Sequence, residues 1–373
     1  MPATFEDTEQ RDRKCELVVQ ASEVEANDAA FPVLLTEANL PAEIFTLAQN
    51  GGGDLRFATE DADPDSNQIP CDIVTFNTVS SKAEIYVKRS ISDTADRSIW
   101  VYYDTSSTSS QPAASHAYGA DNAYHSSYDL FMPMAEDPSG SAPQMLDRTS
   151  NSNDGTTAGT MTSSDSITGQ IGSGLTLDGS DDTITIPDSD SLDFGGDEAF
   201  TMIMWMKHGG GSGSILNKRT GGVGYKIDNN AYGLNIALHA DFYDVLEVYT
   251  DNYWLGSIED AWHQIAVTYD GSEDNSGITL YTDGESYELT LYQNTLTGDF
   301  HNAADLKVFH DGHNADIDSL HIIRRELSND ELMTRFNNES SPATFTVEGA
   351  PADVSAAVTT SPWYYTLQEE VAS

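Results

Sequence analysis

The chain has 373 residues, of which 61 are acidic and 17 basic, and a formal net charge of −44. Nucleic acids and anionic membranes attract proteins through a positive footprint, so this charge argues against both as partners. The carboxylates are spread along the chain, and such a surface repels itself unless salt screens the charges. At about 1 M salt the Debye length, the distance over which charges interact, falls to roughly 3 Å. We therefore expect a protein adapted to high salt.

The first residues, Met1 to Glu9, are polar and acidic and lack the basic and apolar regions of a signal peptide. The sequence also contains no run of about 18 apolar residues, so no membrane insertion is expected. A surface-type chain without a leader is expected in a virion, released by lysis, or as a secreted protein whose leader has been removed. The initiating Met1 favours the virion.

Apolar residues alternate at period two through the first hundred residues, which predicts a strand-rich module over 1–104. A short helix is expected from Pro41, because proline suits the first helical turn. Cys15 and Cys71 lie in or beside predicted strands, and both a disulfide between them and two buried free thiols remain open. The strands expected here are Glu16–Gln20, Phe31–Thr36, Asp54–Phe57, Asp72–Phe76, Ala83–Lys88 and Ser98–Tyr103.

A serine- and threonine-rich linker is expected over 105–124, and a second strand-rich domain over 125–340. Its last element is a short amphipathic helix opened by Ser328, with Glu331 completing a capping box. The remainder, 341–373, reads as a tail whose aromatic residues form a docking segment. The strands expected are Tyr128–Met134, Leu175–Leu177, Thr183–Ile186, Phe200–Lys207, Ser214–Asn217, Gly224–Ile227, Gly233–His239, Leu246–Thr250, Trp262–Tyr269, Thr279–Thr282, Leu306–Phe309 and Ile317–Arg324.

Four separated phrases of the second domain fall in a familiar order. In that order and spacing they resemble the laminin-G-like, concanavalin A-like jelly roll, a two-sheet sandwich that mostly binds sugars or proteins. The phrases are Gly169–Gly172 with Leu177–Asp182, Phe200–Lys207, Ala261–Gly271 and Ile317–Ile323.

The first domain resembles an uncharacterised β-sandwich module often found upstream of such jelly rolls. With its charge, the chain resembles surface or virion proteins of halophilic archaea or their viruses. The resemblance implies an all-β protein of two β-sandwich domains, the second a concanavalin A-like jelly roll. The family's closing Tyr-Gly is replaced here by Tyr103-Asp104.

Ligand binding by such domains uses aromatic rings for stacking and polar side chains for hydrogen bonds to hydroxyl groups. The segment around Trp254 is polar and turn-like, unlike the apolar surroundings of Trp100, Trp205 and Trp262, which we expect in the cores. The alternative is that Trp254 folds back over the sandwich. The candidate ligand residues are Tyr253, Trp254, Asn252, Tyr232 and Asn230.

Calcium is the cofactor that the resemblance implies, because related jelly rolls hold it at the rim of one sheet through oxygen ligands. It points to Asp178, Asp316 and Asp318, although surface aspartates in so acidic a chain are by default solvated. The close pair His310 and His313 is read as part of an exposed loop rather than a metal site.

Catalysis is not expected. The sequence has no Glu-x-Asp-x-x-Glu strand motif of jelly-roll glucanases, no zinc helix and no nucleophile elbow. We expect a binding protein of a virion surface or tail, or of a cell surface, that recognises host-envelope glycans or glycoproteins. Other virion proteins and further copies of the chain are the remaining expected partners. A purely structural decoration protein is the alternative, and a glycoside-active enzyme a more remote one.

Overall fold

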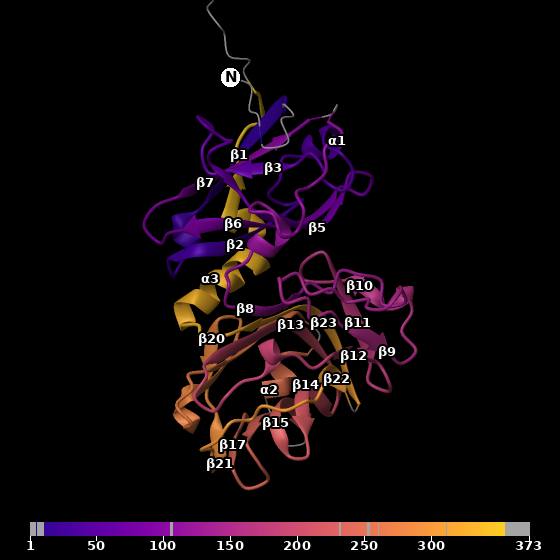
Figure 1. The fold of residues 1–373 in the computed structure, drawn as a ribbon, viewed down its shortest axis with the longest axis vertical. Coiled ribbons are helices and arrows are strands. Elements are labelled where there is room, and N and C mark those ends of the chain that lie inside the picture. Colours follow the sequence, from indigo (N-terminus) through magenta and orange to yellow (C-terminus); the bar gives the residue numbers. More distant parts are fainter. Residues whose placement is uncertain are drawn as a thin grey trace, which may run out of the picture.

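The computed structural model describes residues 5, 11–104, 107–230, 233–251, 254–259, 261–310 and 312–354. Figure 1 shows two strand-rich bodies stacked along the long axis, with helix α3 (Asn329–Ser340) between them. Most of the regular structure is strand, so the protein is all-β, as the period-two pattern predicts. None of the described helices is long and apolar enough to span a membrane.

The first body is a small β-sandwich. Its larger sheet has the order β24-β1-β7-β3-β4 with β25 beside β1, and its smaller sheet has the order β2-β6-β5. Alternate side chains of β1, Cys15, Leu17 and Val19, enter its core. The bounds are β1 (Arg13–Val19), β2 (Asp28–Thr36), α1 (Ile44–Leu47), β3 (Arg56–Ala58), β4 (Gln68–Ile69), β5 (Cys71–Asn77), β6 (Lys82–Ile91), β7 (Arg97–Tyr103), β24 (Thr346–Glu348) and β25 (Ala352–Asp353).

The two cysteines are buried free thiols, so no disulfide joins them. Burial raises the pKa of Cys15 to about 11 and that of Cys71 to about 12. Both thiols therefore stay protonated at neutral pH and act as small apolar core residues.

The second body is a jelly roll of two eight-stranded antiparallel sheets. One, the domain-facing sheet, has the order β10-β11-β23-β13-β18-β19-β20, with β8 beside β23. Its strands are β8 (Tyr128–Met132), β10 (Ser166–Thr168), β11 (Ser173–Asp178), β13 (Phe200–Gly211), β18 (His263–Tyr269), β19 (Ile278–Thr282), β20 (Glu285–Tyr287) and β23 (His313–Ile323).

The other sheet, the outer sheet, has the order β21-β17-β16-β15-β14-β22-β12-β9. Helix α2 (Trp254–Ser257) follows β17 in the chain. The strands of the outer sheet are β9 (Thr156–Ala158), β12 (Thr183–Ile186), β14 (Gly213–Thr220), β15 (Val223–Asn230), β16 (Gly233–His239), β17 (Val245–Tyr249), β21 (Thr290–Asn294) and β22 (Leu306–His310).

Strand β13 is buried on both faces, which explains its unbroken apolar run. Met202, Met204 and Met206 enter the jelly-roll core, while Ile203 and Trp205 enter a second apolar cluster between the two bodies. We call this cluster the interdomain layer. Its buried members are Leu34, Tyr86, Ala123, Tyr124, Tyr128, Phe131, Ile171, Ile203, Trp205, Ala266, Tyr281, Ile323, Leu327 and Leu332.

The expectation that the tryptophans lie in domain cores is therefore corrected. Trp205 is buried between the domains, where its indole N–H donates to Glu339 at 2.7 Å, and Trp262 packs against the same layer. Trp100 lies half-buried on the outer face of the first sandwich, beneath the ammonium group of Lys14. The period-two pattern predicts which side chains share one face of a strand, but it does not indicate which part of the molecule covers that face.

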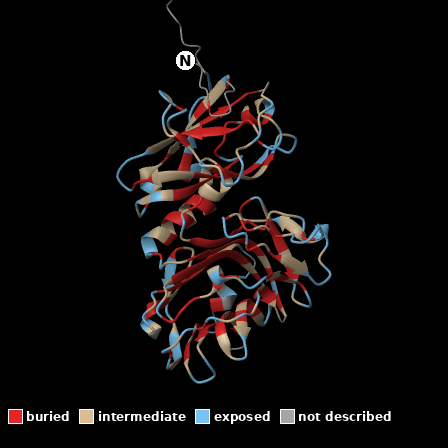
Figure 2. Ribbon diagram, in the orientation of Figure 1, coloured by how far each residue is buried: buried red, intermediate tan, exposed pale blue. Residues whose placement is uncertain are grey.

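Helix α3 joins the two bodies. Ser328 Oγ accepts the amide of Glu331, and the Glu331 carboxylate accepts the amide of Ser328, so the predicted capping box is confirmed. Thr334 Oγ1 accepts the amide of Glu25, and Asn338 Oδ1 accepts that of Leu34, both in the first body. Figure 2 shows the buried middle of this helix between the domains.

The segment after the helix packs against the first body as far as Asp353, and is not the expected free tail. Helix α4 (Pro342–Phe345) brings Phe345 into the first core, where its ring stacks on Phe31, and β24 and β25 then pair with β1. The aromatic residues 363–365 of the expected docking segment lie outside the described residues. The expected linker also contacts the first body, since Gln111 Nε2 donates a hydrogen bond to Gly52 O at 2.7 Å.

Candidate functional site

Trp254, the centre of the predicted ligand site, is 1% exposed and cannot present a ring to solvent. It belongs to the jelly-roll core, and its indole N–H donates to Thr282 Oγ1 at 3.0 Å. The alternative of a ring folded back over the sandwich is thus the correct one. Asn230 is half-buried at the end of β15. The other candidates, Tyr232, Asn252 and Tyr253, lie outside the described residues.

The structure does not bring the three predicted metal ligands together. Asp316 forms an ion pair with Lys207 at 2.9 Å. Asp318 is fully buried between the domains, where it accepts the amide of Ile171 at 2.6 Å. Only Asp178 lies at the rim of the domain-facing sheet, with neighbours that sequence reasoning did not select.

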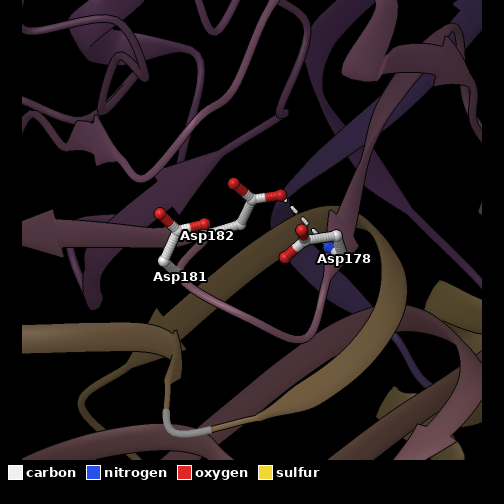
Figure 3. A group of neighbouring side chains, drawn as sticks. All are labelled: Asp178, Asp181 and Asp182. Carbon is white, nitrogen blue, oxygen red and sulfur yellow. Dashed lines mark hydrogen bonds between the residues drawn. The ribbon is translucent and has the colours of Figure 1, made fainter.

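Those neighbours are Asp181 and Asp182, in the turn between β11 and β12. Figure 3 shows the three side chains converging, and one ligand oxygen from each lies within 4.8 Å of the others. Asp182 Oδ2 accepts the amide of Asp178, whereas its buried Oδ1 has no hydrogen-bond partner. Burial raises the pKa of Asp182. The group offers hard oxygen ligands of the kind that Ca²⁺ prefers.

His313 is not in an exposed loop. It opens β23, is 2% exposed, and its Nε2 lies 3.3 Å from Nδ1 of the buried His208 on β13. Burial lowers the pKa of His313 to about 3, so the pair is neutral at ordinary pH. Among the described residues, neither histidine belongs to a group of three close metal-ligating side chains.

The outer sheet has a polar outward face opposite its apolar core face. On β15, Tyr225 and Ile227 enter the core, so the intervening Lys226 and Asp228 point outward. Residues that pair directly across antiparallel strands share a face. The register therefore places two rows outward, Asp228, Asn235 and Tyr249 in one, and Asn217, Lys226, Ala237 and Glu247 in the other.

Hydrogen bonds hold the middle of this face in place. Glu247 Oε1 accepts from Asn235 Nδ2 and from the Tyr249 hydroxyl, each at 3.0 Å. Asp228 pairs with Lys226 and accepts the Ser214 hydroxyl. Both carboxylates are thus engaged by neighbours, which suits a preformed binding surface.

One end of the face carries three buried polar atoms without partners: Asn217 Oδ1, Arg219 Nε and His239 Nε2. Arg219 Nη2 donates to His239 Nδ1 at 3.2 Å, so the proton of the neutral ring lies on Nε2. Burial and the adjacent Arg219 and Lys226 lower the pKa of His239 to about 4. All three atoms are shielded from solvent, so a ligand reaches them only if a neighbouring side chain moves aside.

Aromatic side chains lie on β17, β21 and the hairpin after β16. Tyr249 and Tyr292 meet edge to face with centroids 5.4 Å apart, and Tyr292 is 67% exposed. The hairpin after β16 exposes Phe242 and Tyr243, and the Phe242 ring lies against Gly222 of the neighbouring hairpin. Three of the six large apolar side chains exposed in the described structure belong to this hairpin and to β21: Phe242, Tyr243 and Tyr292.

We call this combined surface the outer-sheet site. Sequence reasoning missed it, although Phe242 and Tyr243 stand between Asp241 and Asp244 in a short turn. Two large rings in a turn between two strands are unusual for a chain that otherwise keeps acidic residues at its surface, and this was the available signal.

Comparison with known proteins supports the fold of the second body. Residues 178–333 match the family model of the concanavalin A-like lectin/glucanases superfamily. This match covers the jelly roll from β11 into helix α3, so both the acidic turn and the outer-sheet site lie within it or at its edge. No curated protein matches the chain.

Solved structures also resemble part of the chain. The binding domain of Paraclostridial Mosquitocidal Protein 1 is 16% identical, with a TM-score of 0.44 over 56% of this chain and 52% of that one. The receptor binding domain of botulinum neurotoxin C/D mosaic serotype is also 16% identical, with a TM-score of 0.42 over 56% of this chain and 51% of that one. The chain thus spans about half the length of each.

Proposed function

We propose that the protein is a non-enzymatic carbohydrate-binding protein whose outer-sheet site holds the glycan. The observation that carries this proposal is the set of exposed aromatic rings, Phe242, Tyr243 and Tyr292, on and beside a polar sheet face. Sugar rings stack on aromatic faces such as those of Tyr292 and Tyr243.

The wider setting is part of the same proposal. A net charge of −44 suits a protein that works in concentrated salt. We place it on a virion surface or tail, binding host-envelope glycans or glycoproteins, among other virion proteins and in homo-oligomers. The alternative is a structural decoration protein, for which a neighbouring subunit would cover the exposed aromatic corner.

The test is binding of the purified full chain to envelope preparations of halophilic cells and to their released glycans, in about 2 M salt. Tyr243→Ala and Tyr292→Ala should each weaken glycan binding about tenfold or more, since each removes one exposed ring. Arg97→Ala and Val79→Ala, in the first body, are the matched controls and should bind normally. No binding to any envelope or glycan by folded protein would favour the decoration alternative, and hydrolysis of the glycan would contradict the non-enzymatic part.

Calcium bound by Asp178, Asp181 and Asp182 is a further part of the proposal, supported by their converging oxygens and the partnerless Asp182 Oδ1. The ion would supply fixed positive charge at this rim and tie the turn between β11 and β12. Calcium should raise the melting temperature of the protein, and Asp181→Asn should abolish that rise while Asp65→Asn, an exposed position in the first body, leaves it. Equal rises in all three proteins would show that calcium acts only by general screening.

A further inference from the structure

Two buried carboxyl groups, one from each domain, meet at the turn Gly169–Gly172. Glu84 of β6 is 1% exposed and Asp318 of β23 is 0% exposed. A Cβ added at Gly172 would lie 2.6 Å from Glu84 Oε2, and one at Gly169 would lie 2.4 Å from Asp318 Oδ2. Both glycines therefore leave room for a carboxyl group at the domain interface.

Each carboxyl group has one oxygen with a partner and one without. Asp318 Oδ2 accepts the amide of Ile171 at 2.6 Å, and Glu84 Oε1 accepts the Tyr86 hydroxyl at 3.3 Å. Glu84 Oε2 and Asp318 Oδ1 are buried and have no hydrogen-bond partner. Buried polar atoms normally have partners, so two bare acceptors at one turn indicate a missing donor.

The charges around the turn are unbalanced. Glu339 of α3 faces Asp318, and its Oε2 accepts from Trp205 and Gln264; Asp72 of β5 is paired with Arg148 at 2.6 Å. Arg335 of α3 is the other nearby cation. Burial lowers the pKa of His321 on β23 to about 3, so this ring is neutral. Arg335 is paired with Asp28 at 3.8 Å, so the layer sets two guanidinium groups against five carboxyl groups: Asp28, Asp72, Glu84, Asp318 and Glu339.

We propose that Glu84 binds a proton at the domain interface, so that docking of the two domains takes up a proton and tightens as the pH falls. A proton from solvent on Glu84 Oε2 makes this partnerless atom a donor and removes one buried charge beside Asp318.

The direction of the pH dependence follows from the carboxyl groups. Burial, and next the charge of Asp318, raise the pKa of Glu84 well above its ordinary value of 4.5. When the domains separate, Glu84 becomes solvated and loses the proton near that ordinary value. Docking is therefore strongest below about pH 4.5. As the pH rises from there towards the raised pKa of Glu84, the docking equilibrium constant falls about tenfold per pH unit for one proton.

The experiment follows hydrogen exchange of the Ile171 amide, which donates to Asp318, in the full chain from about pH 5 to about pH 8 at constant high salt. After correction for intrinsic rates, protection should fall as the pH rises in the unmodified protein. Glu84→Gln should abolish this fall, because the amide supplies the donor at every pH. Glu60→Gln, an exposed residue of the same domain, should behave like the unmodified protein.

Asp318→Asn is a second variant, since its side-chain oxygen can still accept from Ile171. It should shift the fall of protection to lower pH without abolishing it, because burial still raises the pKa of Glu84 when the charge of Asp318 is gone. Equal slopes in the unmodified protein and Glu84→Gln would overturn the proposal. So would recovery of protection at about pH 8 on adding Ca²⁺ or K⁺, because a cation rather than a proton would then occupy the interface.

Discussion

At the scale of single residues, His208 and His313 are buried against each other across β13 and β23. Burial holds the pKa of His313 at about 3, whereas a histidine in the unfolded chain titrates near 6.5. The unfolded state thus takes up a proton that the folded state refuses, so this stability is complete above about pH 6.5 and is lost as the pH falls towards 3.

His313→Asn should reduce this loss in the acid limb by up to about 1.4 kcal/mol per pH unit, the contribution of one proton. The measurement is the free energy of unfolding from about pH 7 to about pH 4. An acid limb of the same slope in both proteins would contradict the buried, neutral state of His313.

Trp254 carries a prediction about stability rather than binding. Its side chain is buried in the jelly-roll core, so Trp254→Ala should cost about 3–5 kcal/mol of unfolding free energy. Denaturant unfolding measures this, and Trp254→Phe should recover a large part of the loss. Normal stability with lost glycan binding would return Trp254 to the ligand site.

The outcome for Trp254 shows how far single-sequence reasoning reaches. A polar segment indicates an exposed ring only if nothing local folds the ring inward, and Asp251, whose carboxylate accepts the Trp254 amide at 3.2 Å, belongs to such a local turn. Similarly, Asp178 and Asp318 both flank apolar strand residues. Only the three-dimensional fold shows that one lies at a rim and the other beneath a second domain.

At the scale of elements, the long strands with strict alternation were predictable and the short ones were not. The apolar run from Phe200 predicts β13, because a strand that is buried on both faces has apolar side chains at successive positions. The edge strands β9, β10 and β20 have three residues each and little alternation. Strands β24 and β25 lie in a Pro-, Ala- and Thr-rich segment, and their partner β1 is over three hundred residues away.

The last two strands yield a prediction for the first domain. A chain ending at Ser340 lacks Phe345 and the strands that pair with β1, so it should lose several kcal/mol of stability compared with a chain ending at Val354. Phe345→Ala in the longer chain should cost about 3–5 kcal/mol. Equal stability of the two chains would show that the first sandwich is complete without its C-terminal strands.

At the scale of the whole molecule, the two sheets of the jelly roll have different roles. The domain-facing sheet packs against the first domain and α3 through the interdomain layer, which covers its central strands. In the described structure the outer sheet has a partly exposed polar face and the exposed rings of Phe242, Tyr243 and Tyr292. Together these observations favour the outer sheet as the ligand-binding face. No local sequence pattern distinguishes the two sheets in this way.

Hydroxyl-radical footprinting of the full chain, with and without a saturating envelope glycan, tests this claim most directly. The method reports the solvent access of individual tyrosine side chains. Binding at the outer-sheet site should protect Tyr249 and Tyr292 while leaving Tyr118, beside the first domain, unchanged. Bound glycan with no protection of Tyr249 or Tyr292, or with protection confined to Tyr287 near Trp254, would contradict it.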